Sequence, residues 1–259
     1  MGRRVNVESS PMKNEIIYGR QPVRELLRAK RRTLFSLSLL ESRKPTPDLA
    51  DIEGLARKMG VRVNFVARQK LDQATDGRNH QGVVVEASGY PTVDFDDLVA
   101  AAKEKGNSAF ILILDHLEDP QNVGSLIRTA EAIGVDGVVI PSDRAVSVTP
   151  SAVRASAGAT EWVKVSVVTN LVRSMKTLQK EGFWITGLEA MPEAKNPSEI
   201  DLNGPVGLVV GSEGSGMGRL VRETCDFLMK LPMVGNVTSY NASVAGAMAM
   251  YEVVRQRNG

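Results

Sequence analysis

The second half of the chain alternates short apolar runs with longer segments of helical periodicity. Short apolar runs bounded by glycine, proline or polar residues are typical of buried strands. Segments of helical pattern, such as 123–133 and 170–181, fill the gaps between them. This alternation predicts an α/β domain whose mostly parallel sheet is covered by helices on both faces. We expect its strands at 109–114, 137–140, 162–167, 183–186, 206–210 and 227–231.

Two loops near the C-terminus hold a concentration of glycine and polar residues. The strand at 206–210 leads into a glycine-rich segment, 211–216, which contains Glu213. The strand at 227–231 leads into a polar segment, 235–243. Ligand sites of open α/β sheets lie at the carboxyl ends of strands, and glycines let the backbone approach a ligand closely. These loops are therefore the candidate site, with two ordinary strand-to-helix turns as the alternative.

The glycine spacing excludes two common phosphate-binding motifs. The segment Gly-Ser-Glu-Gly-Ser-Gly at 211–216 differs from G-x-G-x-x-G, and no Gly-Lys-Ser/Thr follows it. Dinucleotide-binding and Walker-type interpretations are therefore weak.

The first 88 residues have the pattern of a smaller α/β unit. A helix with Pro22 in its first turn, where proline is tolerated, comes first. It is followed by a strand at 34–40, a helix at 46–59 and strands at 61–66 and 82–85. We therefore expect a flexible polar tail over 1–14, a first domain over 15–88, a connector over 89–106 and a second domain over 107–259.

Composition narrows the compartment and the chemistry. No apolar run is long enough to span a membrane, and the N-terminal segment lacks an apolar export signal, so we expect a cytoplasmic protein. The single cysteine, Cys225, permits no internal disulfide and is expected to pack on a helix face. With only two histidines, His80 and His116, we expect no metal site of the usual His/Cys kind.

The charge is unevenly distributed along the chain. Residues 1–70 contain 16 Lys and Arg against 7 Asp and Glu, a net charge of +9, whereas residues 71–259 carry −7. Four basic residues, Arg28, Lys30, Arg31 and Arg32, follow the first helical pattern. Such asymmetry favours an anionic partner, with nucleic acid as the first choice, over an ordinary solvated surface.

A third segment combines polar residues with the start of a helix. It is DHLEDPQNVGSLIRTA, residues 115–130, which follows the strand at 109–114. Asn122 can act there as a helix cap or as a ligand, since helix N-termini bind anions. Arg128, on an otherwise apolar helix, can pair with Glu131 or offer its fork of donors to an RNA phosphate.

Together the segments NVGSLIRTA, GSEGSGM and LPMVGNVTSYNASVA resemble, in this order, the three signature motifs of the SpoU/TrmH family of RNA ribose 2'-O-methyltransferases. The resemblance covers roughly residue 109 to the C-terminus and implies a SPOUT-type domain with a C-terminal trefoil knot. Chain physics alone predicts no knot. The first domain is similar, less closely, to the ribosomal-protein-L30e-like RNA-binding domain that precedes many of these enzymes.

The resemblance also assigns roles to individual residues. S-adenosyl-L-methionine is the implied cofactor, contacted at Leu188, Gly211, Leu231 and Tyr240. The implied catalytic residues are Asn122, Arg128, Glu213, Ser239 and Asn241. Tyr240 departs from the family, which more often has leucine at this position.

Methyl transfer to a ribose hydroxyl is an in-line displacement that requires aligned reactants and stabilisation of the emerging negative charge. A guanidinium is a poor base because its pKa is above about 12. We therefore expect Arg128 to orient a phosphate and stabilise the alkoxide, while a phosphate oxygen or water accepts the proton. Glu213 orients Asn122, Arg128 or the substrate, unless it is a structural carboxylate paired with arginine.

The short first domain is more similar to that of the bacterial 23S rRNA guanosine enzymes than to the tRNA enzymes. We therefore expect methylation of a guanosine ribose in large-subunit rRNA. A tRNA guanosine 2'-O-methyltransferase is the alternative, and a non-catalytic RNA-binding ribosome-assembly protein is a third possibility. The small residues Ala242, Ala245, Gly246 and Ala249 suggest a helix that packs closely, either in a homodimer or within one chain.

Overall fold

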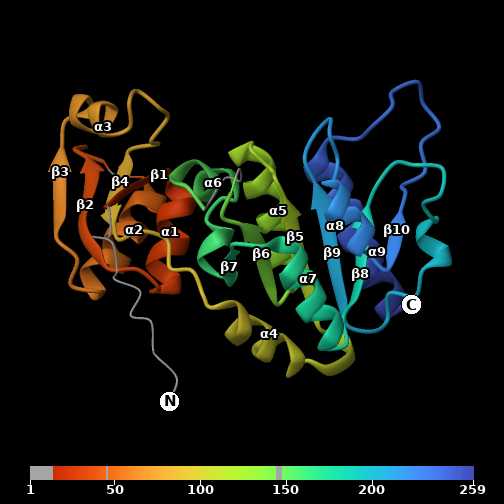
Figure 1. The fold of residues 1–259 in the computed structure, drawn as a ribbon. Coiled ribbons are helices and arrows are strands. Elements are labelled where there is room, and N and C mark those ends of the chain that lie inside the picture. Colours follow the sequence, from red (N-terminus) through yellow and green to blue (C-terminus); the bar gives the residue numbers. More distant parts are fainter. Residues whose placement is uncertain (1–13, 45, 144–147) are drawn as a thin grey trace, which may run out of the picture. The chain divides into compact units, whose positions relative to one another are not determined.

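The structure is a computed structural model that describes residues 14–44, 46–143 and 148–259. The chain divides into two compact units, Met1–Pro91 and Thr92–Gly259 (Figure 1). The tail expected over 1–14 lies, apart from Asn14, outside the described residues. In the described part of the chain, no helix is both long and apolar enough to cross a membrane.

The first unit is a four-stranded sheet with helices on both faces. Its strands are β1 (Glu15–Tyr18), β2 (Leu34–Leu40), β3 (Val63–Val66) and β4 (Val83–Ala87), in the order β1-β4-β2-β3. Its helices are α1 (Arg20–Ala29), α2 (Pro47–Lys58) and α3 (Arg68–Ala74). Helices α1 and α2 pack against each other, whereas Leu71 of α3 forms a separate small cluster with Tyr18 and Val84. The elements β1 and α3 escaped prediction because β1 has only four residues and α3 carries few apolar ones.

Several arginines of this unit are engaged in internal contacts. Arg32, whose side chain is fully buried, pairs with Glu15 at 2.7 Å and lies over the ring of Tyr90. Arg24 bridges two acids of α2, Asp48 at 2.7 Å and Asp51 at 3.0 Å. The expectation that Arg32 belongs to an exposed basic cluster is therefore wrong, because a buried arginine in a salt bridge cannot meet a phosphate.

The second unit is built on a six-stranded parallel sheet. Its strands are β5 (Phe110–Asp115), β6 (Gly137–Pro141), β7 (Val165–Val168), β8 (Trp184–Leu188), β9 (Val206–Gly211) and β10 (Phe227–Met229), in the order β10-β8-β9-β5-β6-β7. Its helices are α4 (Phe95–Lys103), α5 (Pro120–Ala132), α6 (Pro150–Ala155), α7 (Leu171–Lys180), α8 (Arg219–Thr224) and α9 (Ala242–Asn258). The predicted α/β class with a mostly parallel sheet is confirmed.

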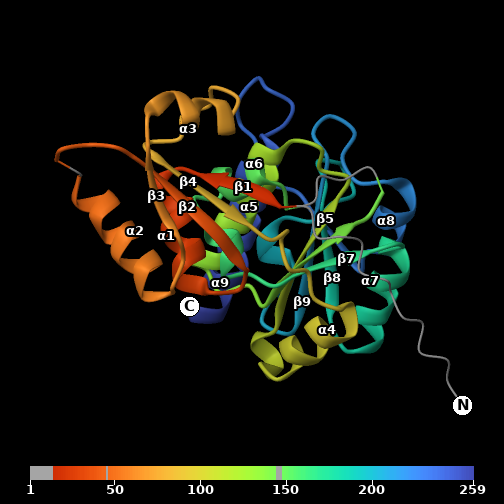
Figure 2. The same ribbon diagram turned by 90° about the vertical axis from the view of Figure 1, so that its left-hand side faces the viewer.

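Helices cover both faces of this sheet (Figure 2). On one face, side chains from α4, α7 and α8 form a core cluster with Ile111 and Ile113 of β5. Because alternate residues of a strand point to opposite faces, Leu112 and Leu114 point to the side of α5 and α9. In the sheet, Asp115 of β5 lies beside Gly211 of β9, so the loops that follow these strands leave from the same edge.

Most element boundaries differ from the predictions by one to three residues, and three cases illustrate the difference. The strand expected over 162–167 begins only at Val165, because Ala159–Glu161 forms a 3-10 turn. The strand expected over 227–231 ends at Met229, and the helix indicated by the small residues at 242–249 continues to Asn258.

The small residues of α9 face the chain's own core. A Cβ on Gly246 would lie 2.4 Å from a methyl carbon of Leu126 in α5 and 3.2 Å from one of Val210 in β9. Ala242 and Ala249 are buried as well. These residues therefore serve close packing of α9 against α5 and β9 within one chain.

The last turn of α9 is attached to the amino ends of the central strands. The Arg257 guanidinium donates to four carbonyl oxygens, those of Ser108 (2.7 Å), Ala109 (3.1 Å), Gly204 (2.8 Å) and Leu202 (3.3 Å). It also lies over the ring of Phe110, the first residue of β5. Burial lowers its pKa, while the Asp136 carboxylate acts in the opposite direction.

Arg257→Met should lower the free energy of unfolding of the second unit by about 2–4 kcal/mol, because several carbonyls lose a charged donor. Arg255→Met, on the same turn, removes only an exposed pair with Glu252 and should cost less than about 1 kcal/mol. Urea unfolding followed by tryptophan fluorescence measures this, since both tryptophans, Trp162 and Trp184, lie in the second unit. Equal costs for the two variants would contradict the role of Arg257.

Candidate active site

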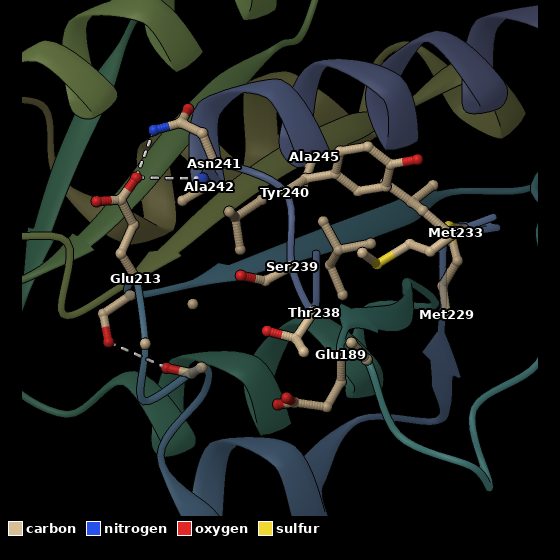
Figure 3. A pocket seen from close by; sticks show the side chains of 18 residues that line it. Glu189, Glu213, Met229, Met233, Thr238, Ser239, Tyr240, Asn241, Ala242 and Ala245 are labelled. Atoms are coloured by element: carbon tan, nitrogen blue, oxygen red, sulfur yellow. Dashed lines mark hydrogen bonds between the residues drawn. The ribbon is translucent and has the colours of Figure 1, made fainter. Parts of the chain in front are cut away.

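A cavity of about 530 Å³ opens at the carboxyl ends of β8, β9 and β10 (Figure 3). Its walls come from three chain segments: the end of β8 with the residues after it, the glycine-rich loop after β9, and the loop between β10 and α9. Seven residues singled out in the sequence line it: Leu188, Gly211, Glu213, Leu231, Ser239, Tyr240 and Asn241. Parallel pairing of β8 and β9 brings the first two of these segments to the same edge.

The side chain of Asn241 joins three separate parts of the site. Its Oδ1 accepts from the Ser243 and Val244 N–H groups, at 3.0 and 3.3 Å, and so caps α9. Because Oδ1 faces these donors, Nδ2 faces two acceptors, Oδ1 of Asn122 at 3.0 Å and a carboxylate oxygen of Glu213. The Glu213–Asn241 contact is drawn in Figure 3. Two residues distant in sequence are thereby oriented by one amide.

Asn122 is not the cap of α5. That role belongs to Asp119, whose side chain accepts from the N–H of Gln121 at 3.0 Å. The capping interpretation of Asn122 is therefore wrong. Its buried side chain instead accepts from Asn241, which holds it beside the cavity.

Arg128 lies apart from the cavity lining, exposed on α5. Among the described residues, the structure gives it no ion pair with Glu131, the partner considered as an alternative. Its guanidinium is therefore open to an external anion. Glu213 is also exposed and contacts amides, which contradicts its alternative as a buried carboxylate paired with arginine.

Tyr240 fits the cavity in place of an aliphatic residue. Its ring lines the wall, while its hydroxyl donates to the carbonyl oxygen of Pro232 at 2.8 Å. Figure 3 shows this hydroxyl directed away from Glu213 and Ser239. The polar end is thus satisfied by the loop's own backbone, and the apolar ring remains to contact a ligand.

The glycine-rich loop is held in a tight conformation. A Cβ on Gly211 would lie 2.4 Å from the carbonyl carbon of Gly216, so no other residue fits there. At the end of the loop, the N–H of Gly218 donates to the fully buried carboxylate of Asp115 at 2.7 Å. The other carboxylate oxygen of Asp115 contacts His116, so β5 anchors the loop that follows β9.

Sequence reasoning missed several lining residues, among them Glu189, Met229, Met233 and Thr238. Glu189 had a usable signal, because it is a charged residue directly after a buried strand, as Glu213 nearly is. The methionines had none, since an apolar residue near a strand end is equally typical of core packing.

Cys225 is part of the structural support and not of the site's chemistry. Burial first, and then the carboxylates of Asp226, Asp115 and Glu189, raise the pKa of its thiol to about 12. A thiol of this kind is inert near neutral pH. Within the described ranges, no cluster of three or more His, Cys, Asp or Glu side chains is arranged to hold a metal ion.

Comparison with known proteins identifies the family. The sequence pattern of the SpoU rRNA Methylase family matches residues 109–251, more than half of the chain. The chain belongs to the SpoU family. Residues 16–93 match the domain described as RNA 2'-O ribose methyltransferase substrate binding.

Two relatives match this SpoU protein along nearly all of its length. It is 46% identical to YacO of Bacillus subtilis, over 95% of this chain and 97% of that protein, and 42% identical to a protein of Staphylococcus saprophyticus, over 95% and 98%. Both relatives carry names that place them among TrmH family tRNA/rRNA methyltransferases.

Solved structures share the fold. The SpoU methyltransferase AviRb of Streptomyces viridochromogenes, in complex with AdoMet, has a TM-score of 0.77 at 22% identity and covers 95% of this chain and 91% of its own. An AdoMet-bound rRNA methyltransferase of Sinorhizobium meliloti has a TM-score of 0.78 at 20% identity, over 94% and 87%. A TrmH/SpoU tRNA modifying enzyme of A. aeolicus, at 26% identity, covers only 63% of this chain and 84% of its own, with a TM-score of 0.53.

Substitution of Asn241 should separate its capping role from its bridging role. Asn241→Ala removes the cap of α9 and should lower the free energy of unfolding by about 1 kcal/mol. Asn241→Ser keeps a side-chain acceptor for the helix N–H groups without placing a second carboxylate beside Glu213, so it should retain most of that stability, although it can no longer donate to both Asn122 and Glu213. Urea unfolding compares the two variants. An equal loss in both would show that the cap is not the source of the stability.

Proposed function

We propose that the protein is an S-adenosylmethionine-dependent RNA 2'-O-methyltransferase that methylates a guanosine ribose in 23S rRNA. The observation that carries this proposal is the joining of Glu213, Asn241 and Asn122 at the mouth of a cavity whose wall contains Leu188, Gly211, Leu231 and Tyr240. Membership of the SpoU family and the names of the full-length relatives support it.

The cavity has the size and lining that the cofactor requires. About 530 Å³ lies within the range of pockets for ligands of this size. Apolar side chains of Leu188, Val210, Leu231 and Tyr240 suit the adenine ring, and the close backbone at Gly211 leaves N–H and C=O groups within reach of its polar atoms. When bound there, S-adenosylmethionine supplies the methyl group.

The chain's own residues position the reacting hydroxyl and stabilise its charge. The amide of Asn241 fixes Glu213 and Asn122, so the polar groups at the cavity mouth are oriented before RNA arrives. Arg128, exposed and charged, holds a phosphate next to the target ribose and stabilises the developing alkoxide. Because a guanidinium is a poor base, a phosphate oxygen or water accepts the hydroxyl proton.

The first unit binds RNA in this proposal. Its match to the substrate-binding domain and the net charge of +9 over residues 1–70 support that role. The exposed Arg28 and Lys30 contribute to phosphate binding, whereas Arg32 stabilises the unit from inside. Phosphate contacts provide affinity and orientation and little sequence information. The competing role is that of a solvated cap that stabilises a dimer.

A ribosomal substrate is favoured over tRNA by the extent of the matches. The fold of the Sinorhizobium meliloti rRNA methyltransferase covers both units, whereas that of the A. aeolicus tRNA modifying enzyme covers 63% of the chain. A tRNA guanosine 2'-O-methyltransferase is the second candidate, since the names of the relatives include both RNAs. The polar array around Asn241 argues against a non-catalytic assembly protein.

The proposal extends to a trefoil knot in the second unit and to a cytoplasmic homodimer. The shared fold with SpoU structures supports the knot. A stripe on α9 supports the dimer: Val244 and Tyr251, which are 48% and 64% exposed, line a shallow depression with Ala247 and Met248. Positions 244, 247, 248 and 251 follow the i, i+3, i+4, i+7 spacing of one helix face. The proposed contact with a second copy of the chain is therefore this exposed stripe, because the small residues of α9 are used for packing within one chain.

Arg128→Ala should abolish methylation while leaving the affinity for S-adenosylhomocysteine within about twofold, because Arg128 lies outside the cofactor cavity. Methylation is measured by mapping 2'-O-methyl groups in rRNA and tRNA of a deletion strain complemented with each variant. Ligand affinity is measured by titrating the purified proteins with S-adenosylhomocysteine. The control is Arg173→Ala, which removes the same charge at an exposed position of α7; this variant should restore methylation. Equal loss of methylation and ligand binding with the fold retained would contradict the assignment, and a missing tRNA site would favour the second candidate.

Val244→Glu combined with Tyr251→Glu should convert the dimer to a monomer, because two charges would enter an apolar contact. Sedimentation velocity at micromolar concentration measures the change. Leu220→Glu, at a 58% exposed position on α8, is the control and should remain dimeric. A wild-type protein that sediments as a monomer would refute the dimer itself.

A further inference from the structure

Among the described residues, all charged side chains that line the cavity are negative. Of the 18 residues that line it in the described structure, two carry a charged side chain, and both are carboxylates, Glu189 and Glu213. The remaining lining residues are apolar, glycine or neutral polar. A ligand in this cavity therefore meets negative charge with no lysine or arginine in the wall to compensate it.

The two carboxylates are in different situations. Glu213 is occupied by Asn241 and by the N–H of Ala242 at 3.4 Å. Glu189 accepts only one long contact, from the N–H of Met217 at 3.4 Å, and the described residues include no ion-pair partner for it. Most of its capacity to accept hydrogen bonds is thus unused by the protein.

Glu189 is nevertheless held in place. It follows β8 directly, is half-buried, and its own N–H donates to the carbonyl oxygen of Met229 at 2.9 Å. Its carboxylate oxygens lie 2.9 and 3.0 Å from the point where Gly216 would carry a Cβ, so the side chain rests against the glycine-rich loop. Figure 3 shows it directed into the cavity, well separated from Glu213.

The thiol of Cys225 lies in the field of Glu189 and of two further carboxylates. After burial, the carboxylates of Asp226, Asp115 and Glu189 contribute to raising its pKa to about 12. Three carboxylates therefore act on one region behind the cavity wall. In that region the fields of Asp115 and Asp226 add to that of Glu189.

We propose that Glu189 is a specificity-determining residue that makes the cavity prefer the positively charged sulfonium cofactor to its neutral thioether product. S-adenosylmethionine and S-adenosylhomocysteine share the adenosyl group and the amino-acid end and differ by one methyl group and one positive charge. A fixed negative charge without a counter-ion attracts the sulfonium, which only S-adenosylmethionine has, whereas its effect on the shared amino-acid end is the same for both ligands. The inference rests on the proposed function, because it assumes this cofactor, and it explains how spent cofactor is released.

The test is calorimetric titration of full-length wild-type protein, Glu189→Gln and Glu193→Gln with both ligands. Glu193→Gln is the control, because it removes the same charge. Glu193 is exposed, lies four residues further along the chain and does not line the cavity. Glu189→Gln should weaken S-adenosylmethionine binding about fivefold to tenfold and S-adenosylhomocysteine binding less than about twofold. Glu193→Gln should leave both affinities unchanged. In the wild type, the preference should also shrink as salt is added.

Two results would overturn the inference while leaving the proposed function intact. If Glu189→Gln weakens both ligands equally, the side chain contacts the part they share and does not sense the charge. If neither affinity changes, Glu189 has no role in cofactor selection. A wild-type protein that binds neither ligand would overturn the cofactor assignment itself, which is a different outcome. Urea unfolding of the variants verifies that each is folded.

Discussion

The site of the second unit depends on the side-chain amide of Asn241, whose oxygen and nitrogen both make structural hydrogen bonds. Asn241 caps α9 with its oxygen and, with its nitrogen, joins Asn122 of α5 to Glu213 of the glycine-rich loop. The cap fixes where the longest helix begins, and the nitrogen fixes the loops relative to that point. A small change in the start of α9 would therefore shift the polar groups and the cavity wall together. Stability and site geometry are coupled through this residue.

The parallel sheet makes that arrangement possible. Because β5, β8 and β9 run in the same direction, the loops that follow them leave from one edge. Asp115 at the end of β5 holds the loop after β9 through the N–H of Gly218. Arg257 attaches α9 at the opposite edge of the sheet. The site is thus built on loops, but the helix that orients it is held at both ends: by α5 and the glycine-rich loop at its start, and by the backbone that precedes β5 and β9 at its last turn.

The α/β class of the second unit and the strand ends that carry the site could be predicted, because buried strands have an unbroken apolar pattern that periodicity detects. The contacts between residues across the site could not be predicted. No pattern in the sequence indicates that Asn241 reaches Asn122, because the contact spans 119 positions and depends on how the sheet is ordered. Arg32 is the opposite case: net charge predicted an anionic partner, but charge counting does not distinguish an exposed arginine from one buried beside Glu15. The small residues of α9 correctly indicated close packing, although the partner is α5 and β9 of the same chain.

In the proposed function, the cavity wall combines two kinds of recognition that differ in how they depend on the ligand. Apolar contact with Leu188, Leu231 and the ring of Tyr240 responds to shape, and so acts equally on a substrate and a product that share a scaffold. Charge responds to the one feature that changes when a methyl group leaves a sulfonium. A binding site made only of apolar contacts would hold the product as firmly as the substrate. The unpaired carboxylate of Glu189, on the wall next to Leu188, is placed where it can break that equality, and the absence of a bulky residue at Gly216 is what leaves room for it.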